Sequence, residues 1–371
     1  MKTRSAVLFS APGKFEMTEI ELDTPRQDEL VVKMVASGIC HSDDHIAVGD
    51  LEVNLPMAGG HEGAGIVMEV GPNTRGYEVG DHVVLAWIPS CGRCRWCAQG
   101  KQNLCDLGAQ TLAGARADDP DSYRLRLNGE NLAQTAGVST FSEYTLVSTS
   151  SAIKVPTHIP LDAACLAACS VGTGWGSAVK VGKVSAGQVA IVMGVGGVGI
   201  HAVQGAAMAG AAHVLAVDPV ALRREAAVTA GATATYADIA EATAAAEELT
   251  NGQGADVAIV CIGVTTPDHI ASAFAAIRKG GTTVVTGLGK GSTVGIPVSP
   301  VELALFEKKL LGSLYGSCVP TWDIPMLLDL YDQGRLKIDE FITRRYPLDR
   351  VNDGFAGMHA GESVKAIVEF P

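Results

Sequence analysis

The stretch VAIVMGVGGVG, residues 189–199, decides the fold of the second half of the chain. Five apolar residues suited to a buried strand run directly into a turn built from Gly194, Gly196, Gly197, Val198 and Gly199. Residues with good helix propensity follow as far as residue 209. Glycines at such a turn let backbone amides approach a pyrophosphate at the N-terminus of the helix. The stretch therefore predicts a dinucleotide-binding unit.

Apolar runs separated by helical stretches continue beyond this turn. Candidate strands cover residues 189–193, 213–217, 233–236, 256–261, 282–286 and 310–315, which is the number found in a doubly wound sheet. The first 170 residues are β-rich, with a polar stretch at 106–140 that we expect to be a surface excursion, and after residue 317 the pattern is irregular again. We predict an α/β protein with a β-rich domain formed by residues 1–172 and 314–371 and a Rossmann domain formed by residues 173–313.

The choice of dinucleotide rests on Asp218, which follows the apolar run 213–217. A carboxylate at the end of this strand accepts hydrogen bonds from the ribose hydroxyls and repels a 2′-phosphate. Two alternatives stand beside this interpretation: Asp218 only caps a helix, or the nearby Arg223 accommodates a phosphate. Because Asp218 is closer to the strand end, we predict NAD rather than NADP as the cofactor.

Four of the nine cysteines, Cys91, Cys94, Cys97 and Cys105, fall within fifteen residues of one another. Four thiolates form a closed tetrahedral zinc site, which is structural because no position is left for a substrate. A bacterial ferredoxin run has a shorter last gap and a following proline, neither of which is present here. We therefore predict a structural zinc ion.

A second set of metal-ligand types, Cys40, His61 and Cys169, is spread along the chain. Two cysteines and one histidine leave one zinc position open, as in a catalytic site, and that position can bind and polarise an alcohol oxygen. The spacing alone also allows three unrelated buried side chains, and Cys165 could replace Cys169 as the ligand. With both sites occupied, we predict two zinc ions per chain.

Composition restricts the class of protein. The chain has 371 residues, is 47% hydrophobic and 18% charged, and carries a net charge of −12. The negative charge argues against nucleic acid as a partner. No apolar run reaches the ~18 residues of a membrane helix, and the N-terminus has no secretory pattern, so we expect no membrane partner and a cytoplasmic location.

Taken together, the motifs resemble those of the zinc-dependent medium-chain alcohol dehydrogenases. GICHSDDH (38–45), GHEG (60–63), the four-cysteine stretch and the glycine turn occur in the order of that family. The resemblance implies that the first domain is GroES-like, that Cys40, His61 and Cys169 bind the catalytic zinc, and that hydride passes between an alcohol and NAD. It also implies a catalytic set and further cofactor contacts. The catalytic set is Ser42 and His45, which relay the proton, and Glu62 behind the metal; the contacts are His41 and Lys365 at the pyrophosphate and Thr173 and Val198 at the nicotinamide.

Three stretches, IPSCGRCRWC (88–97), TGWGSA (173–178) and AVDP (216–219), are similar to the actinobacterial nitrosoaniline-dependent (NDMA-dependent) members of the family. This narrower resemblance implies a tightly held NAD(H) that an external, mycofactocin-type acceptor reoxidises. Trp87 and Thr135 depart from the commoner pocket residues of the family, so the alcohol or aldehyde substrate is left open. We expect a homodimer or a homotetramer.

Three other functions share part of these motifs. A formaldehyde dehydrogenase acting on a mycothiol-type adduct would have the same zinc and NAD sites, and its rate would depend on the thiol. Polyol dehydrogenases commonly lack the four-cysteine lobe. A non-catalytic NAD-binding zinc protein would have no need of the relay residues Ser42 and His45 or of Glu62, all of which are present.

Overall fold

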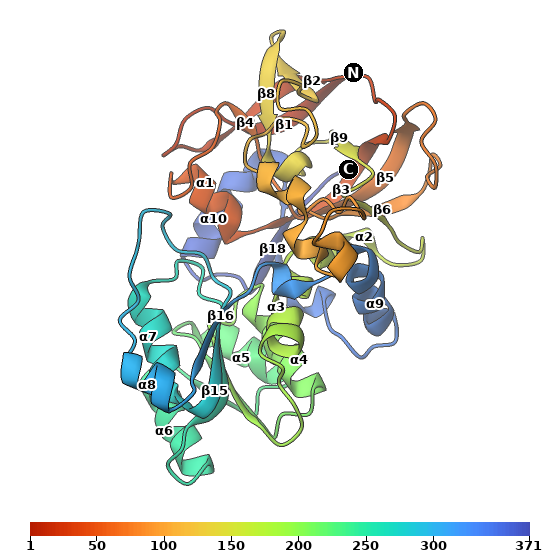
Figure 1. Cartoon of the computed structure of the whole chain (residues 1–371). Helices are drawn as coiled ribbons and strands as arrows, with labels where there is room; N and C mark the ends of the chain where they lie inside the picture. Colours follow the sequence, from red (N-terminus) through yellow and green to blue (C-terminus); the bar gives the residue numbers. More distant parts are fainter. The chain divides into compact units, whose positions relative to one another are not determined.

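The computed structural model describes residues 1–371, which divide into two compact units (Figure 1). Unit 1 comprises Met1–Cys169, Val319–Ala360 and Lys365–Pro371, and unit 2 comprises Ser170–Cys318 and Gly361–Val364. The predicted boundaries at 172/173 and 313/314 lie three and five residues from these. The return of the chain to the first unit was predicted, whereas nothing in the sequence indicated that residues 361–364 belong to unit 2.

Unit 2 is built on a parallel sheet of six strands, one for each predicted run. In sheet order these are β13 (Ala234–Tyr236), β12 (His213–Val217), β11 (Val189–Met193), β14 (Ala255–Val260), β15 (Ile277–Val285) and β16 (Lys309–Gly312). The helices of the unit are α3 (Ser170–Gly176), α4 (Gly199–Met208), α5 (Ala221–Thr229), α6 (Ile239–Leu249), α7 (Pro267–Ala276) and α8 (Pro300–Leu305). Every residue of β11 is buried, which explains why its sequence is an unbroken apolar run rather than an alternating one.

Unit 1 contains a closed barrel and a seven-stranded sheet. The barrel strands, in order, are β1 (Lys2–Leu8), β2 (Phe15–Leu22), β7 (Leu125–Leu127), β8 (Glu130–Gln134) and β4 (Met57–Ala58). The sheet runs through β10 (Ala152–Lys154), β6 (His82–Leu85), β5 (Gly63–Val70), β3 (Glu29–Ile39), β18 (Lys365–Glu369) and β17 (Ile342–Pro347), and β9 (Tyr144–Ser148) also pairs with β3. Its α-helices are α1 (His41–Ala47), α2 (Leu161–Ala164), α9 (Pro320–Asp332) and α10 (Val351–His359).

The predicted surface excursion at 106–140 is wrong for its second half. Strands β7 and β8 lie there and pair with β2 and β4 in the barrel, and Leu125 and Leu132 are fully buried. These strands are short and carry polar side chains on their outer face, so a local sequence window resembles a loop. Their burial depends on partners that are distant in the sequence.

No helix in the structure combines the length and the apolar character that crossing a membrane requires.

Candidate active site

Strand pairing in unit 1 brings together the three predicted ligands of the catalytic zinc. Cys40 directly follows β3, and His61 precedes β5, which pairs with β3 so that Ser37 faces Gly63. Cys169 ends the short 3₁₀ helix Cys165–Ala168. The ligand atoms of Cys40, His61 and Cys169 all lie within 4.8 Å of one another, and all three residues are buried. The structure thus brings Cys169 beside two residues that precede it by more than a hundred positions in the chain.

Cys165, the alternative to Cys169, is not part of this set. Its side chain is fully buried and its thiol donates a hydrogen bond to the backbone oxygen of Asp162, at 3.1 Å. The structure therefore favours Cys169 as the third ligand.

The imidazole of His61 is oriented for metal binding. Its Nδ1 lies 2.9 Å from Oδ1 of the buried Asp43, while its Nε2 is buried and has no hydrogen-bond partner. Since a carboxylate can only accept, Nδ1 carries the proton and Nε2 presents a lone pair. A carboxylate behind a histidine is the usual second partner of a zinc ligand. The role of Asp43 was not predicted, because nothing in the sequence distinguishes it from its neighbour Asp44.

The thiol of Cys40 has the electrostatic surroundings of a metal ligand. A hydrogen bond from Cys169, followed by the effect of His61, lowers the pKa of Cys40 well below its ordinary value, although burial opposes this. The thiolate is the form that coordinates a metal. Two sulfurs and one unpartnered nitrogen match the zinc ligand set that leaves one position open.

The four remaining predicted ligands form a separate, closed set. The sulfurs of Cys91, Cys94, Cys97 and Cys105 lie within 4.8 Å of one another. Backbone amides point at them: the N–H of Cys94 donates to Cys91 Sγ at 3.3 Å, and the N–H of Cys91 donates to Cys105 Sγ at 3.3 Å. Amides of this kind, first that of Cys97, lower the pKa of Cys94 to about 6. Four thiols with amide donors fit a structural zinc site.

Helix α1 carries the predicted proton relay. Ser42 Oγ lies 3.7 Å from Cys40 Sγ, so its hydroxyl adjoins the three-ligand set. His45, three residues further on, is on the same side of the helix and is only 2% exposed. Its Nδ1 lies 2.9 Å from Oδ2 of Asp50, which follows the end of the helix. Asp50 was not predicted, because its contact depends on how the chain turns after α1. His41, the first residue of α1, is half-buried.

Glu62 and Lys365 form a buried ion pair. Glu62 is fully buried, and Lys365 donates to Glu62 Oε2 and, at 3.0 Å, to the backbone oxygen of Ile39. Burial alone would lower the pKa of Lys365, but the Glu62 carboxylate outweighs it and the pKa is raised. Strand β18 pairs with β3 beside Ile39, which places Lys365 here. The predicted contact between Lys365 and a pyrophosphate stays a prediction.

In unit 2 the glycine turn has the geometry of a dinucleotide site. Gly194 has a positive φ of 80°, which L side chains rarely adopt, and a Cβ on Gly199 would lie 1.8 Å from the oxygen of Gly194. A Cβ on Gly196 would meet only Val364, at 3.8 Å. The turn therefore needs glycine at its two ends and leaves space beside its middle, ahead of α4. Gly197 and Val198 complete the turn into this helix.

Asp218 lies at the end of β12 beside this turn. One carboxylate oxygen accepts from the N–H of Val195 at 3.0 Å and the other from the N–H of Val220 at 2.9 Å. Arg223 Nη1 lies 4.0 Å from the same carboxylate, and its Nε donates to the oxygen of Ser363 at 3.2 Å. Asp218 therefore opposes the charge of the arginine that could otherwise attract a phosphate. Thr173, on α3, has a buried hydroxyl without a hydrogen-bond partner.

Known proteins share this architecture. Residues 26–157 match the family model of the alcohol dehydrogenase GroES-like domain, and residues 197–333 match that of the zinc-binding dehydrogenases. The chain is 46% identical to the NDMA-dependent alcohol dehydrogenase of Amycolatopsis methanolica, covering 99% of each chain, and 46% identical to putative alcohol dehydrogenase D of Mycobacterium tuberculosis, covering 99% and 100%. A solved alcohol dehydrogenase zinc-binding domain protein from Burkholderia ambifaria superposes with a TM-score of 0.92 at 34% identity, covering 100% of this chain and 99% of that one. With both metal-ligand sets and the glycine turn in place, the chain belongs to the zinc-dependent medium-chain alcohol dehydrogenases.

Proposed function

We propose that this dehydrogenase oxidises a small alcohol at the site formed by Cys40, His61 and Cys169. The observation that carries the proposal is the buried, unpartnered Nε2 of His61, held toward the two thiols by Asp43. When bound there, zinc polarises an alcohol oxygen and lowers its pKa. NAD supplies the hydride acceptor, and the glycine turn of unit 2 is the segment that would bind its pyrophosphate.

The proton of the alcohol would leave through α1. Ser42 is the first acceptor and donor, because its hydroxyl adjoins Cys40. His45 takes the proton next at Nε2, since the Asp50 carboxylate can only accept and so keeps the proton of Nδ1 in place. We assign Asp50 a positioning role: it fixes the ring orientation of His45 and stabilises the charge that the ring acquires.

Glu62 would act from behind the ligand set. Its partner Lys365 offsets the cost of burying the carboxylate completely. A held carboxylate at this place can stabilise positive charge at the neighbouring site, and we assign it that role together with Lys365. His41, Thr173, Val198 and Arg223 remain our candidates for cofactor contacts.

We infer that NAD(H) stays bound between turnovers and is reoxidised in place by an external acceptor of the mycofactocin type. Supporting this are the 46% identity to a relative named for its dependence on NDMA and the three stretches of sequence similar to that group. None of the nine cysteines forms a disulfide, and six of them belong to the two metal-ligand sets, which supports a reducing, cytoplasmic location.

The test is to pass the purified enzyme through a gel-filtration column and then add alcohol. Retained NAD would give one enzyme equivalent of reduced-nicotinamide absorbance, and steady turnover would begin only when a nitrosoaniline is added. Steady turnover on free NAD, with no cofactor retained on the column, would overturn the retention proposal and leave alcohol oxidation intact. An absolute dependence of the rate on a thiol would point instead to a thiol-adduct formaldehyde dehydrogenase.

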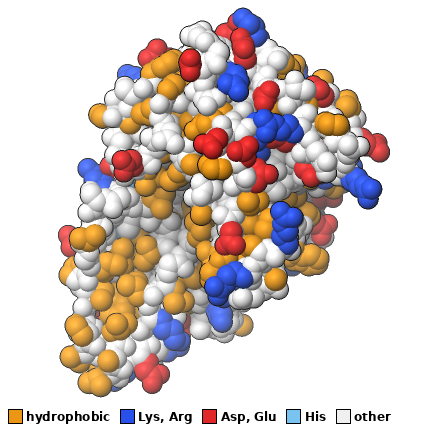
Figure 2. Space-filling model, turned by 45° about the horizontal axis from the view of Figure 1, so that its top comes forward, with side chains coloured by type: hydrophobic (Ala, Val, Ile, Leu, Met, Phe, Trp, Pro, Cys, Tyr) orange, Lys and Arg blue, Asp and Glu red, His pale blue; other side chains and the backbone are white.

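We also propose that the chain forms a homodimer, alone or within a tetramer, through β16 and the neighbouring α8. Strand β16 is an edge of the unit 2 sheet, and such edges are normally covered. Large hydrophobic side chains are exposed in α8 and in the segment before it: Leu305 at 76%, Val301 at 58% and Val294 at 89%. Hydrophobic patches are visible on the surface of the molecule (Figure 2). Light scattering after chromatography should give a dimer or tetramer for the wild type and a monomer or weakened assembly for Leu305→Asp. A monomeric wild type would contradict the proposal.

A further inference from the structure

Unit 1 contains a cavity of about 530 Å³ that the dehydrogenase reaction does not use. Parts of residues 26–29, 89–93, 107–119 and 148–151 line it, together with Arg124. None of the residues assigned to the catalytic zinc or the proton relay is among them. The volume lies in the range typical of small-molecule sites, ~300–1,000 Å³.

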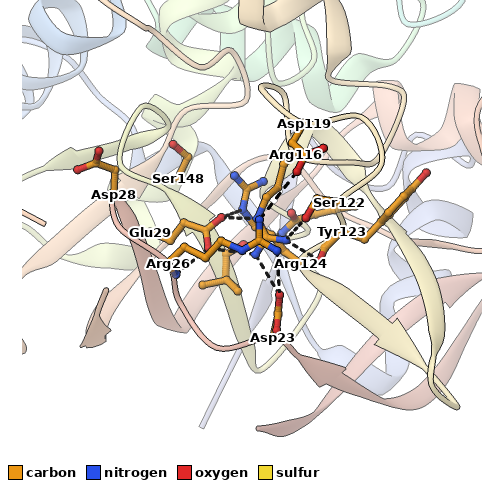
Figure 3. Close-up of polar contacts among 12 residues, drawn as sticks. Asp23, Arg26, Asp28, Glu29, Arg116, Asp119, Ser122, Tyr123, Arg124 and Ser148 are labelled. Atoms are coloured by element: carbon orange, nitrogen blue, oxygen red, sulfur yellow. Dashed lines mark hydrogen bonds and ion pairs between the residues drawn. The ribbon is translucent and has the colours of Figure 1, made fainter. Parts of the chain in front are cut away.

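Two buried arginines share one carboxylate at the wall of this cavity (Figure 3). Arg116 donates from Nε to Glu29 Oε1 at 2.8 Å and from Nη2 to Oε2 at 3.1 Å, and Arg124 donates from Nε to Oε1 at 2.7 Å. The side chains of Arg116, Arg124 and Glu29 are only 3%, 6% and 5% exposed. Burial alone would raise the pKa of Glu29, but the two arginines, Arg116 first, lower it below 4.5.

The two arginines differ in how many of their N–H donors have hydrogen-bond partners in the protein. Arg116 Nη1 donates to Ser122 Oγ at 2.9 Å and to the backbone oxygen of Tyr123 at 2.7 Å, and Nη2 also reaches Asp23 at 3.3 Å. In Arg124 neither Nη1 nor Nη2 has a hydrogen-bond partner in the protein. Burial, together with the neighbouring Arg116, lowers the pKa of Arg124. The Nη donors of this largely buried side chain are therefore left to water or to a ligand.

A second unpartnered group lies in the same cavity. Ser90 Oγ is buried without a hydrogen-bond partner, although the backbone N–H of Ser90 donates to the oxygen of Ser150 at 2.8 Å. Ser90 and Arg124 thus belong to the lining of one cavity, and each has a donor that no group of the protein accepts. A ligand group that accepts several hydrogen bonds could bind to both donors.

The exposed residues that line the cavity carry both signs of charge. Arg26 and Arg93 are positive, and Asp28, Asp118 and Asp119 are negative. Arg26 lies 4.0 Å from Asp119, so these two partly neutralise each other. A ligand with a second anionic group would meet the three aspartates, whereas hydroxyl or amine donors would be well placed there. The charges therefore favour a ligand with a single anionic group.

We propose that this cavity binds a small organic molecule with one oxyanion, a carboxylate or a phosphate monoester, held by the Nη donors of Arg124 and the hydroxyl of Ser90. The planar guanidinium fork matches such groups in bidentate geometry. Cys91 and Arg93 belong to the four-cysteine segment and also line the cavity. A bound ligand would therefore tie this segment to β3, which begins at Glu29, and stabilise the holoenzyme.

The test uses calorimetric titration of the full, zinc-loaded chain in the presence of saturating NAD, so that the dinucleotide site is blocked. The probes are glycerol 3-phosphate and glycerate, which separate the two oxyanions, and glycerol as the uncharged control. We expect one or both anionic probes to bind and glycerol not to bind. Failure of both anionic probes to bind at millimolar concentration would overturn the proposal.

Two variants and one control assign the binding to this cavity. Arg124→Lys keeps the charge beside Glu29 but removes the fork, and Ser90→Ala removes only the hydroxyl. We expect Arg124→Lys to raise the Kd about tenfold, or about 1.4 kcal/mol, and Ser90→Ala to raise it less. Arg126→Lys is the matched control, because Arg126, two residues further along the chain in β7, donates to Asn131 at 2.9 Å and does not line the cavity. Unchanged binding in both folded variants would overturn the proposal.

Discussion

Replacing Asp43 by Asn should weaken zinc binding at the catalytic site without unfolding the chain. The Asp43 carboxylate lies 2.9 Å from His61 Nδ1, and the two side chains are 1% and 6% exposed. A hydrogen bond to a charged group contributes ~1.5–3 kcal/mol and a neutral one ~1 kcal/mol. Asn keeps an acceptor in the same place but loses the charge, so the expected loss is ~1–2 kcal/mol, or about 5- to 30-fold in zinc affinity. Asp43→Ala removes the acceptor as well and should approach ~100-fold.

The assay is the loss of alcohol oxidation in chelator buffers, with the released zinc counted by a colorimetric reagent. Asp44→Asn is the matched control, because the neighbouring Asp44 contacts His359 at 2.8 Å and not the ligand set. The reasoning would be refuted if Asp43→Asn retained wild-type zinc affinity, or if Asp44→Asn lost as much.

Three further predictions concern cofactor choice, acid stability and the relay. Asp218→Ala should narrow the preference of the enzyme for NAD over NADP, measured as the ratio of Kd values; a wild type that binds both equally would contradict the role of Asp218. The pKa of Glu29 is lowered in the folded chain, so its contribution to stability is present above the unfolded value, near 4.5, and is lost as the pH falls through the folded pKa. In urea titrations, the free energy of unfolding should therefore fall more steeply with decreasing pH in the wild type than in Glu29→Gln, which is also destabilised at neutral pH. Parallel dependences of the unfolding free energy on pH would refute this. His45→Gln should lower kcat by roughly 10²-fold with partial rescue by added imidazole, and Asp50→Asn should lower it less; unchanged rates would remove both from the relay.

The parts of this molecule that could be predicted from sequence are those that depend on local pattern. The strands of unit 2 were found because a parallel strand buried on both faces is an unbroken apolar run, as in β11. Asp218 was found from its place after such a run. The four-cysteine set was found from its spacing, because zinc ligation by neighbouring residues leaves a local signature.

What could not be predicted depends on long-range pairing. Strands β7 and β8 are too short and too polar on one face to be recognised without β2 and β4. Asp43 and Asp44 are adjacent and chemically identical, and only the position of His61 distinguishes their roles. In the same way, Arg116 and Arg124 lie in a polar segment whose sequence gives no sign that both converge on Glu29.

The central claim is that the chain holds two metal sites with separate roles, one of which is catalytic. Native mass spectrometry of the wild type, Cys169→Ser and Cys94→Ser, combined with alcohol oxidation assays, tests it most directly. We predict two zinc ions in the wild type, a folded but inactive Cys169→Ser with one zinc fewer, and a Cys94→Ser variant whose main defect is a lower melting temperature, because the energy of a structural site is folding energy. A wild type with a single zinc, or a Cys169→Ser variant that still oxidises alcohol, would contradict the account.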